Sequence, residues 1–121
     1  MGVSSKGRRE ISHRNRLYYW YVEPDYDDEG IIKVHIISED KKFIVSYEVG
    51  QYSVKNQSPY IVIIGQEFEG LPKNYTGYRR VLTPNWIDAI ITPKLVSEII
   101  DWCLLKEKDI KVVNWKGEII E

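Results

Sequence analysis

The chain has 121 residues, of which 43% are hydrophobic, and a formal net charge of −1 at pH 7. A chain of this length fits one domain with a core of its own, and the near-neutral charge excludes a protein that is basic all over, such as one that packages duplex DNA. The single cysteine, Cys103, excludes an intramolecular disulfide, and no apolar run reaches the roughly 18 residues that a membrane span needs.

The first 22 residues hold five cations and one acid, followed at once by an acidic run over 23–30. Because the cations stand where a secretion signal would have its apolar region, we expect a cytoplasmic protein with no membrane partner. Residues 1–9 are small, polar and basic, which predicts a flexible basic arm ahead of a single domain over 10–121. The domain is expected to open with strands over 10–12 and 16–23.

A short turn at His13, Arg14 and Asn15 joins these two strands, because Asn tolerates positive φ. Alternating apolar residues then predict a second hairpin, with strands over 31–38 and 43–49.

A polar loop over 50–58 precedes residues 60–64, whose continuous β-branched run is typical of a strand buried on both faces. A second long loop over 65–77 contains three glycines and one proline and leads to a short extended piece over 78–82. Loops of this length inside a compact domain are usually functional or mobile.

Thr92 and Pro93 together predict the start of a helix, as N-cap and first helical residue. Apolar residues recur on one face from there to Lys106, so we predict an amphipathic helix over 93–106. The chain ends with a predicted hairpin of strands over 111–115 and 118–120. Together these elements predict an α+β fold: one mostly antiparallel sheet of about five to seven short strands, packed against one main C-terminal helix.

Catalytic residues are scarce. The chain has two histidines, His13 and His35, and its only thiol, Cys103, lies on the apolar face of the predicted helix, where a cysteine is usually an inert core residue. The sequence contains no nucleophile elbow, zinc-protease motif or phosphate-binding glycine loop. We therefore expect a protein that is not an enzyme and has no cofactor.

The acidic run from Asp25 to Gly30 has the spacing of the start of a calcium loop, but Ile36 stands where the last bidentate ligand should be. This excludes an EF-hand and favours a solvated loop, and we predict no metal site.

Cations next to flat rings can hold phosphates and stack bases. The N-terminal region combines both, which predicts single-stranded nucleic-acid binding through Lys6, Arg8, Arg9, Arg14, Arg16, Tyr18 and Trp20. Alternation over 17–22 sends Tyr19 and Tyr21 to the opposite face from Tyr18 and Trp20, so one set of rings is expected to be exposed. The competing interpretation is a central strand in which both sets are core.

A third interpretation starts from the nine tyrosines and four tryptophans, residue types that are enriched at protein interfaces. It predicts a protein partner or a homodimer, formed through an aromatic face or a free sheet edge. The segments over 7–11, 19–22, 38–40 and 91–93 resemble stretches of small bacterial proteins. This resemblance implies no activity and no site residues.

Overall fold

The computed structural model describes residues 8–25, 31–51, 59–65, 67–68, 79–84, 86, 91–105, 110–114 and 118–119. In chain order these residues form β1 (Arg9–His13), β2 (Arg16–Asp25), β3 (Ile31–Ser38), β4 (Ile44–Glu48), β5 (Tyr60–Ile63), β6 (Arg79–Leu82), α1 (Pro93–Cys103) and β7 (Val112–Val113).

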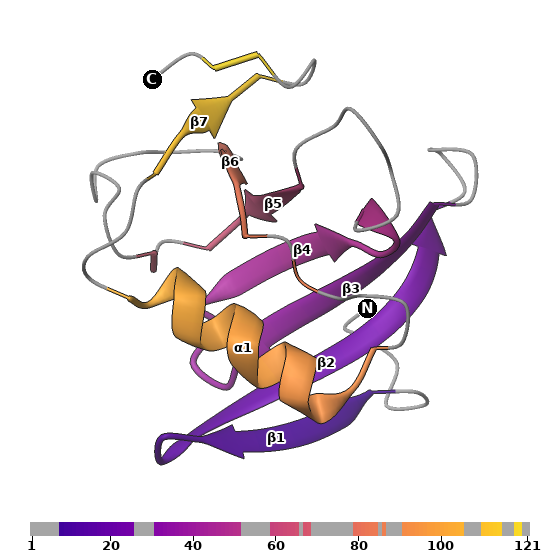
Figure 1. Ribbon diagram of the computed structural model, residues 1–121. Helices are drawn as coiled ribbons and strands as arrows, with labels where there is room; N and C mark the ends of the chain where they lie inside the picture. The colour runs from indigo at the N-terminus through magenta and orange to yellow at the C-terminus, as the bar shows by residue number, and fades with distance from the viewer. Residues whose placement is uncertain are drawn as a thin grey trace.

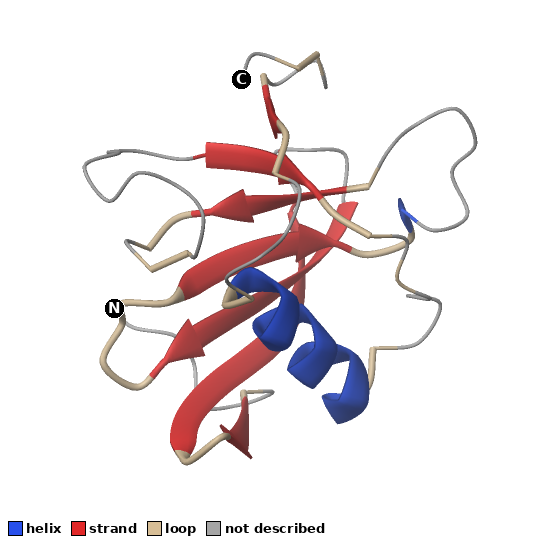
Figure 2. Ribbon diagram, turned by 60° about the vertical axis from the view of Figure 1, so that its left-hand side comes forward, coloured by secondary structure: helices blue, strands red, loops and turns tan. Residues whose placement is uncertain are grey.

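The strands make one seven-stranded antiparallel sheet in which each strand pairs with the next one in sequence, in the order β1-β2-β3-β4-β5-β6-β7. Helix α1 lies across one side of this sheet, in front of β2, β3 and β4 in Figure 1, and Figure 2 shows the same arrangement from a second direction. The predicted α+β fold, with one sheet and one C-terminal helix, is therefore confirmed.

Each strand presents alternate side chains to the two sides of the sheet, and the strand register decides which residues share a side. We call the side under α1 the covered face. Most of its strand residues are buried and form the core with the apolar side of the helix: Tyr18, Trp20, Val34, Ile36, Val45, Tyr47, Ile61, Ile63, Val81 and Val112. Val22 and Ile32 lie on the same side but are exposed. We call the opposite side the open face, because no helix or strand of the described residues packs on it.

Helix α1 begins as the sequence predicts. The Thr92 hydroxyl accepts a hydrogen bond of 3.2 Å from the Leu95 amide, and Pro93 occupies the first turn. The helix ends at Cys103 with Leu104 as its C-cap, earlier than the predicted end at Lys106, and its last turn contains no basic residue. Residues 106–109 lie outside the described residues.

The core is closed by tightly fitted contacts. Trp86 meets the rings of Tyr47 and Trp102 edge-on, at centroid distances of 5.5 and 5.8 Å. Gly65 lies so close to the chain after β3 that a Cβ atom there would stand 2.5 Å from the Lys42 carbonyl oxygen and 2.7 Å from the Ile44 nitrogen. Only glycine fits this position without moving the backbone. Cys103 is fully buried, as expected for a core residue.

Two strands differ from the prediction. Pro24, expected in a loop, pairs with Ile32 near the end of β2, beyond Trp20 where pairing with β1 stops. On that side of β2, the described residues include no strand opposite Pro24, so its missing N–H leaves none of their backbone acceptors without a partner. Strand β5 was expected to be buried on both faces, but only Ile61 and Ile63 are buried, while Tyr60 and Val62 are half-buried on the open face.

Several predicted features lie outside the described residues: residues 1–7 of the basic arm with Lys6, the acidic run over 26–30, and most of the two long loops. In the predicted last hairpin, β7 covers only Val112–Val113, and Ile119 forms a single bridge to Val113.

Candidate binding surfaces

Tyr18 and Trp20, the two rings predicted to stack bases, are buried. Their exposed fractions are 2% and 5%, and both belong to the core beneath α1. Tyr18 packs edge-on against Phe43 with ring centroids 5.6 Å apart. A ring with no exposed face cannot stack a base, so the prediction that these two residues stack is wrong. The alternation placed the rings correctly on two faces, but it could not decide which face the helix covers.

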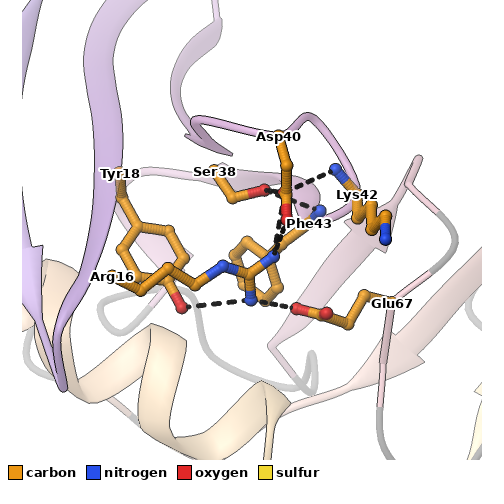
Figure 3. Close-up of polar contacts among 7 residues, drawn as sticks. All are labelled: Arg16, Tyr18, Ser38, Asp40, Lys42, Phe43 and Glu67. Carbon is orange, nitrogen blue, oxygen red and sulfur yellow. Dashed lines mark hydrogen bonds and ion pairs between the residues drawn. The ribbon is translucent and has the colours of Figure 1, made fainter.

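Arg16 lies at the edge of this core and is held by two carboxylates (Figure 3). Its guanidinium forms an ion pair with Glu67 and donates to both oxygens of Asp40 at 2.9 and 3.1 Å, with a longer contact of 3.5 Å to the Tyr18 hydroxyl. Burial opposes the charge on Arg16, but the hydrogen bonds to Glu67 and Asp40 outweigh it, so the pKa of Arg16 rises above its ordinary value.

Asp40 is itself fixed by the turn between β3 and β4. It accepts hydrogen bonds from the Ser38 hydroxyl at 2.5 Å and from the Lys42 amide at 3.1 Å, and these, together with Arg16, hold the pKa of its carboxyl well below the ordinary range. The Ser38 oxygen in turn accepts from the Phe43 amide at 3.0 Å. Arg16 is therefore part of a structural network and could contact a phosphate only by giving up these carboxylates.

Arg14 and His13 meet the helix at one carboxylate. The Arg14 Nε donates to Asp101 Oδ1 at 2.9 Å, and His13 Nε2 lies 2.7 Å from the same oxygen. Partial burial raises the pKa of Asp101, but the hydrogen bonds from His13 and Arg14 outweigh it, and the net shift is downward. The turn between β1 and β2 is thereby joined to the end of α1.

The backbone at this turn is unusual. The His13–Arg16 pair closes the hairpin, and both loop residues have positive φ, 52° at Arg14 and 63° at Asn15. Asn tolerates this region, but a long side chain such as Arg costs about 1 to 2 kcal/mol there. An exposed ion pair returns about 0 to 1 kcal/mol. The stability gained from the contact with Asp101 therefore does not explain why the residue at this position is arginine.

The arm cations within the described residues cover rings. Arg8 lies over Tyr19 on the open face, with its guanidinium carbon 4.2 Å from the ring centroid, and Arg9 lies 5.5 Å from the centroid of Trp20 on the covered face. The six predicted nucleic-acid residues that the structure describes thus do not form one surface. Of these six, only Arg8 shares the open face with half-buried aromatic side chains.

The open face carries an aromatic surface whose rings are not among the seven predicted nucleic-acid residues. Its centre is a band of half-buried aromatic and aliphatic side chains on four strands: Tyr19, Tyr21, His35, Ile37, Ile44 and Val62. Ser46, a buried polar residue, lies between His35 and Val62 in the register. Tyr21 stacks on His35 with centroids 4.9 Å apart, and Arg80 lies over Tyr60 at 4.4 Å. Burial, reinforced by Glu23, raises the pKa of Tyr21.

Charges of both signs border this band. Lys33 lies between Glu23 and Glu48 in the cross-strand register, and His35 Nε2 is 3.2 Å from Glu23 Oε1. On the β1 side, Glu10 pairs with Tyr19. The open face therefore combines an apolar, ring-bearing centre with a mixed rim. Lys33 and His35 in β3 could have identified this face from the sequence. As polar residues at alternate positions they mark the side of β3 that faces away from the core, and Tyr19 and Tyr21 of β2 lie on that same side.

In the described part of the chain, His13 makes its one hydrogen bond with Asp101, so the imidazole has no nucleophile within reach there. The described residues contain no group of three or more His, Cys, Asp or Glu that could hold a metal ion. Nor do they include a helix long and apolar enough to cross a bilayer, since α1 has 11 residues. Comparisons with protein-family models, with curated proteins and with solved structures find no match to this chain.

Proposed function

We propose that this protein is a non-catalytic, cytoplasmic binding domain that recognises another protein through its open face. The observation that carries this proposal is the apolar band of Tyr19, Tyr21, Ile37, Ile44 and Val62 with charges of both signs at its border. An apolar centre with a polar rim is the usual composition of a protein interface, and tyrosine and arginine contribute most to binding there.

The charges on β1 favour the open face over the sheet edge as the surface that binds a partner. This edge strand carries Arg9 and Glu10, both exposed, and charged side chains on an edge strand oppose pairing with another strand. The open face has no such obstacle at its centre, and its tyrosines can contribute contact area at a small cost in conformational entropy.

A second function, single-stranded nucleic-acid binding, is supported by two arginines that lie over rings of the open face, Arg8 over Tyr19 and Arg80 over Tyr60. The same cations could hold phosphates while the rings take bases. Glu10, Glu23 and Glu48 on the same face would repel a phosphate backbone, which is why we place this function second.

The direct test of protein binding has two stages. Sedimentation velocity at about 10 to 200 µM measures whether a second copy binds with a Kd in that range. If the protein stays monomeric, affinity capture from cells that express it is compared among wild type, Tyr21→Ala and Lys94→Ala, the last a control on the exposed side of α1. Loss of a hot-spot tyrosine lowers affinity by at least about 2 kcal/mol, roughly thirtyfold.

We expect a dimer, or a captured protein, that is lost with Tyr21→Ala and retained with Lys94→Ala. Binding that is unaffected by Tyr21→Ala would place the interface elsewhere and contradict the proposal.

Nucleic-acid binding is tested by fluorescence anisotropy of a labelled mixed-sequence single strand at about 50 and 200 mM salt, where each neutralised phosphate contributes about 0.7 to the logarithmic salt slope. Binding that weakens steeply with salt and is lost in Arg8→Gln and Arg80→Gln would make this second function the correct one. No binding at low salt would exclude it.

A further inference from the structure

A groove runs between the turn that joins β1 to β2 and the C-terminal end of α1. Its volume is about 760 Å³, within the range of roughly 300 to 1,000 Å³ that is usual for small-molecule sites. The residues lining it on the sheet side are His13, Arg14, Arg16 and Tyr18, and those on the helix side are Asp101, Leu104 and Leu105. The groove lies on the helix side of the sheet, away from the open face.

Arg14 is the side chain at this groove that is best prepared to receive a ligand. Asp101 binds its Nε, and in the described part of the chain Nη1 and Nη2 make no hydrogen bond, while the side chain is 77% exposed. The outer edge of the guanidinium therefore presents two parallel N–H groups whose direction is fixed from behind by a carboxylate. This fork matches the two oxygens of a carboxylate or a phosphate.

Arg16 does not compete for this role, because its two Nη atoms already donate to Glu67 and Asp40. The groove also offers apolar surface. Leu105 is 50% exposed, although it is a large hydrophobic residue, and Leu104 lines the same space. A ligand that fits both parts carries an oxyanion at one end and an apolar body behind it.

The positive φ of Arg14 supports the same conclusion. Arginine is unfavourable in this backbone region, and its exposed ion pair with Asp101 does not compensate for the strain, whereas glycine or asparagine would fit the turn. A strained residue that is not explained by stability is a candidate for function.

We infer that this groove binds an oxyanion, a carboxylate or a phosphate, carried on an apolar body, with the Nη edge of Arg14 holding the oxyanion and Leu104 and Leu105 contacting the body. This site is independent of the open face and of any partner bound there.

The test is a titration followed by ¹H–¹⁵N NMR with four small probes. Hexanoate and hexyl phosphate carry both parts, acetate carries only the oxyanion, and hexanol carries only the apolar body. We expect saturable shifts at the Arg14 side chain and at the Leu104 and Leu105 amides, with a Kd on the order of 1 mM for hexanoate or hexyl phosphate. The tighter of the two identifies the headgroup. Acetate should bind at least about tenfold more weakly, because each buried methylene contributes.

Two variants decide the assignment. Arg14→Gln should abolish the saturable shifts, and Arg8→Gln, an exposed cation on the opposite face, should leave them unchanged. Arg14→Gly should lose binding without a loss in Tm, since glycine suits the turn. The inference is overturned if hexanoate and hexyl phosphate fail to saturate by about 20 mM, a concentration well above the expected Kd. It is also overturned if Arg14→Gln binds as wild type does, or if hexanol binds as tightly as hexanoate.

Discussion

Strand β2 carries aromatic side chains on both of its sides, and the two sets meet different surroundings. Tyr18 and Trp20 face α1 and are almost fully buried, whereas Tyr19 and Tyr21 face away from it and stay half-buried. The same residue types therefore serve as core on one face and as surface on the other. The position of one helix decides which rings are buried, because the strand alone places the two sets in equivalent positions on its two sides.

The cations divide in the same way. Arg16 reaches the rim of the covered face and is held by Asp40 and Glu67, while Arg8 lies over Tyr19 on the open face. A basic and aromatic segment is thus not one binding surface when it forms a strand. Alternation splits it into a structural half and a half that can meet a partner.

The largest expected difference between the two faces is in stability. Tyr18→Ala or Trp20→Ala should lower the free energy of unfolding by about 3 to 5 kcal/mol, because each leaves a cavity beneath α1. Tyr19→Ala and Tyr21→Ala should cost about 1 kcal/mol, in the range of ordinary substitutions outside the core. Urea denaturation of the four variants measures this directly. Equal losses on both faces would mean that the open face is covered.

The next largest effect on the free energy of unfolding is expected at Gly65, in the loop after β5. Gly65→Ala should lower the free energy of unfolding by about 1 to 3 kcal/mol, because the new methyl group would overlap the backbone at Lys42 and Ile44. Gly50→Ala is the comparison: among the described residues, apart from its two chain neighbours, no atom lies within 4 Å of a Cβ there, and its φ of 95° is what opposes the change. If Gly65→Ala unfolds at the same urea concentration as wild type, this result would contradict the close approach of Gly65 to the Lys42 backbone.

Acid should weaken the network around Arg16. The pKa of Asp40 is lower in the folded protein than its ordinary value of about 3.9. Its contribution to stability is therefore complete above that value. As pH falls below it, the unfolded chain takes up the proton first and the contribution is lost until the folded carboxyl is also protonated.

The measurement is the free energy of unfolding between about pH 6 and pH 3, a range that crosses the ordinary pKa of Asp. Wild type should lose more stability over this range than Asp40→Asn, which has no carboxyl at this position. Asp101, whose pKa is also lowered, contributes in the same direction and remains in both proteins. Parallel pH profiles for the two proteins would contradict the role given to Asp40.

The smallest expected effect is that of the open-face cation. Arg8→Gln should change the free energy of unfolding by no more than about 0.5 kcal/mol, as is usual for an exposed position. Its consequence should appear in binding instead, because it removes the guanidinium over Tyr19. Thermal unfolding monitored by circular dichroism is sufficient to check it, and a fall in Tm of more than about 4 °C would indicate a structural role.

The sequence predicted most of the elements because local patterns decide them. Thr92 and Pro93 marked the start of the helix, and alternation in β3 and β4 gave their strands and their inward sides. The end of the helix was less clear, since Leu104 and Leu105 continue the apolar pattern beyond the last hydrogen-bonded turn. The prediction that Pro24 lies in a loop was wrong, because a proline can stand in β2 only beyond the point where the described pairing with β1 stops, and the sequence does not show that point.

The sequence by itself determined that this chain forms one α+β unit, with rings on both sides of β2 and cations next to them. Only the tertiary structure decided which rings are core, which cations are neutralised by distant carboxylates, and that the β1–β2 turn meets the end of α1 at Asp101. The reason is physical. Periodicity is a property of neighbouring residues, but burial and charge pairing depend on contacts such as Arg16 with Glu67, which are 51 residues apart.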